Sequence, residues 1–109
     1  MRSIRALTCF LALWSLILVG QTTRSVHGIV RDKAGNALPK VVVQIEDSIT
    51  LQIRSFITRK DGSYYFEGLS PDITYNLVAR YRKFSSDTKH LSKFDSSKQA
   101  AMDFIINVD

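Results

Sequence analysis

The segment TRKDGSYYF, residues 58–66, constrains the fold of this chain more than any other feature of its sequence. Asp61-Gly62 is a strong turn dipeptide, because glycine accepts the positive φ of a tight turn and the Asp side chain bonds back to its own backbone. Residues with a preference for β-strands flank the dipeptide on both sides. We therefore predict a β-hairpin, in which a strand over Leu51–Thr58 turns through Arg59–Gly62 and returns over Ser63–Glu67.

The predicted turn also determines which residues of the two strands face each other. Thr58 faces Ser63, and four further pairs follow outward. These pairs are Ile57 with Tyr64, Phe56 with Tyr65, Ser55 with Phe66, and Arg54 with Glu67. Because side chains alternate faces along a strand, Ile57, Ser55, Tyr64 and Phe66 share one face, on which we expect Tyr64 and Phe66 to be buried. Tyr65 is left outside, and a slip of one residue would put apolar groups into water.

Residues 1–25 have the pattern of a secretory signal peptide. Arg2 and Arg5 form a short basic region, and Ala6–Gly20 follows without any charge. This apolar run of about 15 residues suits a signal peptide, whereas a membrane-spanning helix needs about 20. Small residues at Thr23 and Ser25 predict cleavage after Ser25; cleavage after Gly20 and an uncleaved anchor are the alternatives. We therefore expect export by this signal, to the periplasm or the medium, and the sequence leaves both destinations open.

The composition narrows the class of protein that residues 26–109 can form. Cys9 is the chain's one cysteine and lies in the predicted signal peptide, so the exported domain is not a disulfide-stapled scaffold. The formal net charge of +5 falls to +2 when Arg2, Arg5 and Arg24 leave with the signal. The remaining charges are interspersed, so we expect no nucleic-acid partner. The length is sufficient for one small domain.

Short runs with strand character recur along residues 26–108 and are separated by turn residues. We expect seven strands: Val26–Arg31, Val41–Glu46, Leu51–Thr58, Ser63–Glu67, Tyr75–Tyr81, an irregular one over Thr88–Leu91, and Ala101–Val108. Outside the hairpin, the alternating residues expected to face inward are Val26, Gly28 and Val30; Val41, Val43 and Ile45; Tyr75, Leu77, Ala79 and Tyr81; and Met102, Phe104, Ile106 and Val108. Such spacing of short strands is typical of an all-β sandwich or barrel.

Three motifs, in order along the chain, carry a family resemblance. They are Gly28-Ile-Val-Arg-Asp32 leading through Gly35 and Leu38-Pro39 into Val41-Val-Val43, the TRKDGSYYF segment, and Gly68-Leu-Ser-Pro71 followed by Tyr75-Asn-Leu77. With this order and spacing, residues 26–108 resemble the carboxypeptidase regulatory-like domains of the transthyretin-like (prealbumin-like) group, which have a carbohydrate-binding-like β-sandwich fold. Lys89–Lys98 is similar to single-domain exported bacterial members. The resemblance implies a seven-stranded Greek-key β-sandwich that serves as an accessory or interaction module.

The sequence does not supply the residues of a recognisable enzyme. His27 and His90 are the histidines of the predicted exported domain, and neither lies in an HxxE or HExxH spacing. We therefore expect no catalytic residue, no metal site and no cofactor. Catalysis in the carboxypeptidases belongs to a separate zinc domain. The related hydroxyisourate hydrolases carry a C-terminal Tyr-Arg-Gly-Ser motif, which residues 105–109 do not match.

We expect a non-catalytic exported module that mediates protein interaction or has a structural role in the cell envelope. Its expected partner is an extracytoplasmic protein, and membrane contact would occur only through an uncleaved signal segment. The alternative is a carbohydrate-binding module. Its candidate ligand surface is Phe56 and Tyr65, with Arg54 and Glu67 flanking them, because sugars stack on exposed aromatic rings. The simpler interpretation of this pair is that it stabilises the hairpin. An unrecognised hydrolase is a third alternative.

Overall fold

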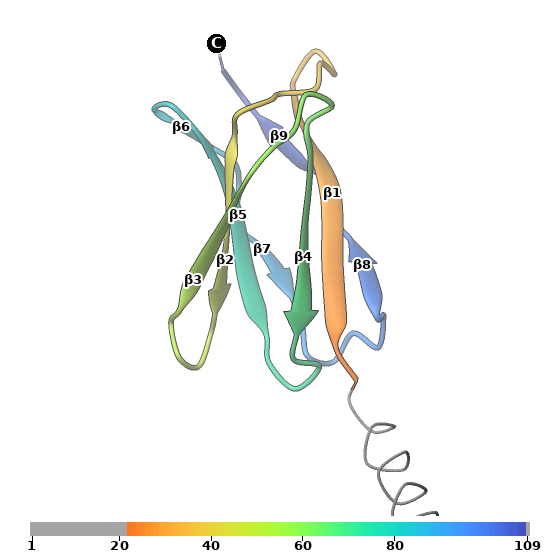
Figure 1. The fold of residues 1–109 in the computed structure, drawn as a ribbon. Coiled ribbons are helices and arrows are strands. Elements are labelled where there is room, and N and C mark those ends of the chain that lie inside the picture. The colour runs from red at the N-terminus through yellow and green to blue at the C-terminus, as the bar shows by residue number, and fades with distance from the viewer. Residues whose placement is uncertain (1–21, 109) are drawn as a thin grey trace, which may run out of the picture.

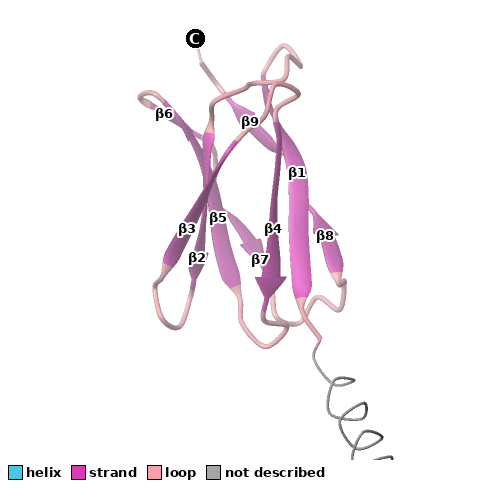
Figure 2. Ribbon diagram, viewed as in Figure 1, coloured by secondary structure: helices cyan, strands magenta, loops and turns pink. Residues whose placement is uncertain are grey.

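The computed structural model describes residues 22–108, and within this part of the chain every regular element is a β-strand (Figures 1 and 2). The strands are β1 (Arg24–Asp32), β2 (Val42–Asp47), β3 (Ile53–Ile57), β4 (Ser63–Leu69), β5 (Tyr75–Tyr81), β6 (Phe84–Ser85), β7 (Lys89–Leu91), β8 (Gln99–Ala101) and β9 (Phe104–Ile106). The first sheet has the order β4-β1-β8, with β9 also paired to β1. The second has the order β3-β2-β5-β6, with β7 also paired to β5. The predicted β-sandwich is therefore confirmed.

The core lies between the two sheets and is formed by alternate residues of the long strands. The buried apolar side chains include Val26, Val30, Val41, Val43, Ile45, Tyr75, Leu77, Ala79, Leu91, Phe104 and Ile106. These positions confirm the predicted alternation in β1, β2 and β5. The other predicted core positions, Tyr81, Met102 and Val108, are partly buried at its margin.

The predicted last strand is divided into β8 and β9, which both pair in parallel with β1. The division occurs at Met102 and Asp103. Met102 N–H donates to His27 O (2.9 Å), whereas Ile29 N–H donates to the Asp103 carboxylate (2.9 Å) rather than to a backbone oxygen. Gly28 lies between these two bonds, and a Cβ at this position would be 1.7 Å from Met102 O. The close approach of the two backbones therefore requires glycine at residue 28.

The predicted β3–β4 hairpin is wrong, because β3 and β4 belong to different sheets. β3 pairs with β2, and Phe56 lies opposite Val43; β4 pairs with β1, and Tyr64 lies opposite Gly28. The Asp61-Gly62 turn does form, with a φ of 76° at Gly62. It carries the chain from one sheet to the other as an arch instead of returning it along the same sheet (Figure 1).

Thr58 explains why the chain leaves the second sheet at this point. Its hydroxyl donates to Leu38 O (2.7 Å) and accepts from Val41 N–H (2.9 Å), and its own N–H donates to Val41 O (2.8 Å). Thr58 is only 4% exposed, so these bonds are shielded from water. On the other side of the turn, Gly62 O accepts from Val30 N–H of β1 (2.9 Å). Each end of the turn is thus bonded to a different sheet.

The arch reverses the predicted orientation of β3 and preserves that of β4. Ile57, expected on the buried face, is 63% exposed, and Phe56 instead turns inward and packs against the core. Tyr64 and Phe66 are buried and Tyr65 is 41% exposed, as predicted. The sequence therefore identified the buried face of β4 correctly. It did not identify the buried face of β3, because the two strands do not pair with each other.

The predicted signal peptide falls largely on residues 1–21, outside the residues that the structure describes, so its cleavage stays a prediction. Arg24 and Ser25, which cleavage after Ser25 would remove, lie in β1. Arg24 is 4% exposed, and its guanidinium donates to Ser97 O (2.8 Å) and Ser92 O (2.9 Å). Cleavage after Gly20 leaves these bonds in place. Within residues 22–108, no helix has the length and apolar character needed to cross a membrane.

Candidate functional site

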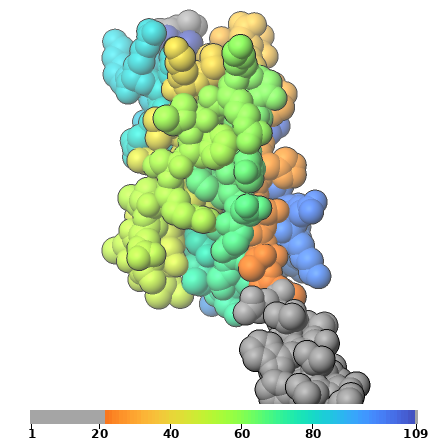
Figure 3. Space-filling view, viewed as in Figure 1, coloured from red at the N-terminus to blue at the C-terminus, as the bar shows by residue number. Residues whose placement is uncertain are grey.

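The outer strands β3 and β4 lie on the same side of the sandwich, where the chain crosses between the sheets. β3 pairs only with β2, and β4 only with β1, among the described strands. Figure 3 shows this side, with β3 and the loop before it in yellow-green beside β4 in green. Two neighbouring strand edges on one surface therefore have no further strand partner among the described strands.

The edge of β3 and the loop before it carry an exposed apolar surface. Seven large hydrophobic side chains are exposed among the described residues, and four of them lie within residues 49–57. They are Ile49 (72% exposed), Leu51 (64%), Ile53 (55%) and Ile57 (63%), and we call them the β3 apolar surface. Clustering of exposed apolar side chains on one element indicates an interaction site more strongly than isolated ones do.

The backbone of β3 leaves hydrogen-bonding groups unused at this edge. Thr58 N–H bonds Val41 O, and the antiparallel register places Phe56 opposite Val43. Because bonded pairs alternate along an antiparallel ladder, Phe56 and Arg54 direct their N–H and C=O groups to β2. The same groups of Ile53, Ser55 and Ile57 therefore point away from the sheet. Within residues 22–108, no strand pairs with these donors and acceptors, which lie beside the apolar side chains of the edge.

The structure brings together the residues of the predicted ligand surface, although not as a hairpin. The rings of Phe56 and Tyr65 lie 5.4 Å apart across the gap between the two sheets. Arg54 and Glu67, which were predicted to face each other, are in contact: Arg54 Nη2 donates to the backbone oxygen of Glu67 (3.1 Å), and the salt bridges of the described residues do not include this pair. Tyr65 is exposed, whereas Phe56 is partly buried. Their role as a ligand surface stays a prediction.

Arg59 completes this aromatic cluster and was not identified from the sequence. Its guanidinium carbon lies 5.4 Å from the Phe56 ring centre and 5.2 Å from that of Tyr65. A cation at this distance is attracted to the face of an aromatic ring. Arg59 therefore occupies ring surface on which a sugar would otherwise stack. The sequence marked Arg59 only as a turn residue, because its contacts depend on the crossing between the sheets.

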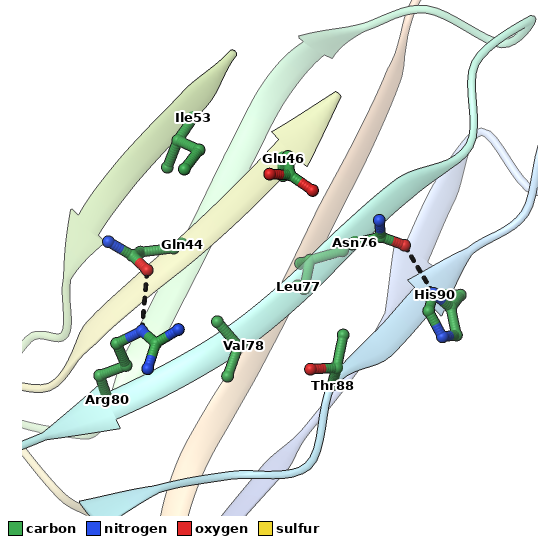
Figure 4. Close-up of a pocket in the computed structure, with 9 residues that line it drawn as sticks. All are labelled: Gln44, Glu46, Ile53, Asn76, Leu77, Val78, Arg80, Thr88 and His90. Carbon is green, nitrogen blue, oxygen red and sulfur yellow. Dashed lines mark hydrogen bonds between the residues drawn. The ribbon is translucent and has the colours of Figure 1, made fainter. Parts of the chain in front are cut away.

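A polar groove lies on the outer face of the second sheet, across β2, β5 and β7 (Figure 4). Figure 4 shows Arg80 Nε donating to Gln44 Oε1 (3.0 Å), and His90 Nδ1 bonded to Asn76 Oδ1 (2.6 Å). The side chain of Ile53 stands at one margin of this groove. Most of its polar groups bond to one another, which stabilises the face of the sheet.

The ionisable groups with shifted pKa values serve structural roles. Burial raises the pKa of the Tyr64 phenol, and the charge of Asp103 adds to the effect. The neutral phenol donates to Met102 O (2.6 Å) in the core. The N–H groups of Thr50 and Ile49 lower the pKa of Asp47, and the hydroxyl and N–H of Ser63 lower that of Asp61. These carboxylates are acceptors within turns, where the ionised form is favoured.

The two histidines lie in different sheets. His27 is in β1 and His90 is in β7. Among residues 22–108, no three His, Cys, Asp or Glu side chains gather closely enough to hold a metal ion.

The sequence matches the model of the carboxypeptidase regulatory-like domain family over residues 25–106. Among curated proteins, none matches the chain. The structure is similar to the dioxygenase domain of a dioxygenase carbohydrate-binding protein fusion from Streptomyces sp. SirexAA-E, with a TM-score of 0.59 and 16% identity over 83% of this chain and 82% of that one.

Two further similar structures are a pilin domain and a second dioxygenase. The C-terminal domain of the shaft pilin SpaA from Lactobacillus rhamnosus GG has a TM-score of 0.57 and 13% identity, covering 80% of this chain and 98% of that one. The 3-chlorocatechol 1,2-dioxygenase from Rhodococcus opacus 1CP has a TM-score of 0.61 and 11% identity, covering 81% of this chain and 60% of the enzyme. At these identities, the similarities show a shared fold and not a shared activity.

Proposed function

Because the chain belongs to the carboxypeptidase regulatory-like domain family, we propose that it is a non-catalytic module, exported to the periplasm or the medium, that binds a protein partner. The binding site is the edge of β3 with the β3 apolar surface. The partner supplies an extended segment that adds to the second sheet beside β3. This mode of recognition takes its affinity from main-chain hydrogen bonds and its specificity from alternate side chains.

The observation that carries this proposal is the lack of protection at the β3 edge. Natural proteins blunt open edges with charged side chains, prolines or bulges, because an open edge pairs with other chains. The one charged residue of β3, Arg54, reaches across to Glu67 O and does not guard the edge. Ile53, Ser55 and Ile57 instead present apolar or small side chains beside free backbone groups. This combination suits an incoming strand.

Leu51 provides a second argument from the same surface. It has a φ of 63° and is 64% exposed, at the end of the loop before β3. A non-glycine residue in this region costs roughly 1–2 kcal/mol, and an exposed leucine gains nothing from burial in the free protein. Backbone strain of this kind gathers at sites of function. We attribute the leucine at this position to contact with the partner.

The non-catalytic part of the proposal rests on how the reactive groups are used. The turn carboxylates have lowered pKa values, whereas a general acid at neutral pH needs a raised one. The phenol of Tyr64 is committed to Met102 O. The similarity to dioxygenases is a similarity of fold at 16% identity or less. It supplies no reason to transfer their reaction to this chain.

Site-specific photo-crosslinking in the native cells tests the proposal. A benzophenone amino acid replaces Ser55 in β3 or, as the matched control, Ser85 in β6, which is also an exposed serine in an outer strand. We expect crosslinked protein adducts from position 55, lost when Ile57→Lys is added, and none from position 85. Equal adducts from both positions, or none from position 55, overturn the proposal.

Carbohydrate binding is the second candidate function, favoured by the exposed Tyr65 ring beside Phe56. The Arg59 guanidinium over both rings opposes it. Affinity electrophoresis in gels that contain cell-wall or plant polysaccharides tests this candidate, with Tyr65→Ala as the comparison. A wild-type protein that is not retarded in any of these gels excludes glycan binding at this surface.

A further inference from the structure

We propose that the partner of β3 is a second copy of this chain, paired antiparallel about a twofold axis that passes through Ser55. This inference rests on the proposed use of the β3 edge for binding and specifies the partner at that same edge. The resulting dimer joins the second sheets of two molecules into one continuous sheet. A twofold interface requires that one surface be complementary to itself, and the sequence of β3 satisfies this condition.

The register of the proposed dimer is determined by which residues of β3 direct their N–H and C=O groups to the free edge. Ile53, Ser55 and Ile57 direct their N–H and C=O groups to the free edge, as argued from the Thr58–Val41 bond. Antiparallel pairing about Ser55 places each of these residues opposite another residue of the same set. Ser55 then faces Ser55 of the partner subunit, and Ile53 faces Ile57 of the partner subunit. Every free group along β3 gains a bond in this register.

The side chains of β3, IRSFI, are complementary in the same register. On the outer face, Ile53 and Ile57 of the two copies meet as facing pairs, which removes apolar side chains that are 55% and 63% exposed from water. On the inner face, Arg54 lies opposite Phe56 of the partner subunit, so no like charges face each other. The small, exposed Ser55 side chains meet at the axis.

The neighbouring twofold registers lack this complementarity. An axis at Arg54 places the two Arg54 side chains directly opposite each other, and facing like charges are destabilising. An axis at Phe56 leaves the free backbone groups of Ile53 without a partner residue in the strand. The axis at Ser55 uses all the free groups and opposes no charges. Self-pairing is therefore specific to one alignment.

A charge-swap experiment tests this pairing on the full chain, purified as the cell exports it. Ser55→Lys and Ser55→Glu each place like charges opposite each other only in a homodimer. We expect the wild type to have twice the single-chain mass in light scattering and sedimentation, each variant alone to have the single-chain mass, and an equimolar mixture to regain the doubled mass. Both substitutions are at an exposed position, so circular dichroism should be unchanged.

Disulfide trapping tests the register. In a Cys9→Ala background, Ser55→Cys places thiols on Cα atoms about 5.5 Å apart across the axis, within the range of a disulfide. Ile53→Cys is the matched control, because the two copies of this residue lie about 13 Å apart along the strand direction. We expect a crosslinked dimer from Ser55→Cys and none from Ile53→Cys. Equal crosslinking at both positions overturns the register.

The outcomes separate this inference from the function on which it rests. A wild-type protein that has the single-chain mass at every concentration, or a mixture that does not regain the doubled mass, overturns self-pairing. If position 55 still crosslinks to a different protein in cells, then β3 binds a partner that is not a second copy. If position 55 crosslinks neither to a second copy of the chain nor to a different protein, both the proposed function and this inference are wrong.

Discussion

Replacing Thr58 by valine tests whether its hydroxyl holds the end of β3 in the second sheet. Valine has nearly the same shape as threonine but no hydroxyl, so Thr58→Val leaves Leu38 O and Val41 N–H without their bonds of 2.7 and 2.9 Å. Thr58 is 4% exposed and Val41 is fully buried, so water does not replace these bonds. An unsatisfied buried polar group costs about 1–3 kcal/mol, which gives a loss of about 2–6 kcal/mol for the two groups.

Urea unfolding followed by circular dichroism measures this loss. Thr58→Ser retains the hydroxyl and removes one methyl group, so it should cost only about 1 kcal/mol. Thr88→Val is the control, because Thr88 is exposed on the outer face and its change should stay within about 0.5 kcal/mol. A Thr58→Val protein as stable as the wild type, or more stable than Thr58→Ser, refutes the role assigned to the hydroxyl.

Three further predictions follow from the packing, the turns and the N-terminus. Gly28→Ala should destabilise the domain by about 3 kcal/mol, because its Cβ would lie 1.7 Å from Met102 O; a melting temperature within about 2 °C of the wild type contradicts this. The lowered pKa of Asp61 means that its contribution to stability is complete above the unfolded-state value of 3.8 and is lost as the pH falls through the folded-state value. Urea midpoints measured from pH 5 down to about pH 2 should therefore decline, and Asp61→Asn should remove part of that decline; an unchanged dependence in Asp61→Asn contradicts it. The exported protein should begin at Gln21, because cleavage after Gly20 retains the buried Arg24 in β1; mass spectrometry that finds Val26 as the first residue overturns this prediction.

The sequence was sufficient to predict those features of the fold that depend only on the alternation of side chains within one strand. β1, β2 and β5 bury one face each, and the period of two in their apolar residues identified that face. The interruption between β8 and β9 could not be inferred, because it depends on parallel pairing with β1 and on the Asp103 carboxylate that accepts from Ile29 N–H. A side-chain acceptor that substitutes for a strand bond has no signature in a pattern of hydrophobicity.

The hairpin prediction failed because turn chemistry is local and the choice of strand partner is not. Asp61-Gly62 specifies a reversal of the chain, and that reversal is present. Whether the next strand returns in the same sheet depends on Thr58, which bonds to residues 17 and 20 positions earlier in the chain. Phe56 and Tyr65 were expected to be neighbours and are, but they meet because two sheet edges lie side by side. The same crossing brought in Arg59, whose contacts the sequence did not predict.

The arch also explains why the molecule has an open edge at β3. In a hairpin, β4 would pair with β3 and use the backbone groups of Ile53, Ser55 and Ile57. Because Thr58 holds the end of β3 and the chain crosses to β1, β4 pairs elsewhere and these groups stay free. Arg54 bonds to Glu67 O and so covers part of the β4 edge, whereas no described side chain is bonded across the β3 edge in this way. Of the two neighbouring edges, the β3 edge is therefore the more accessible to a partner strand. The same edge carries the β3 apolar surface.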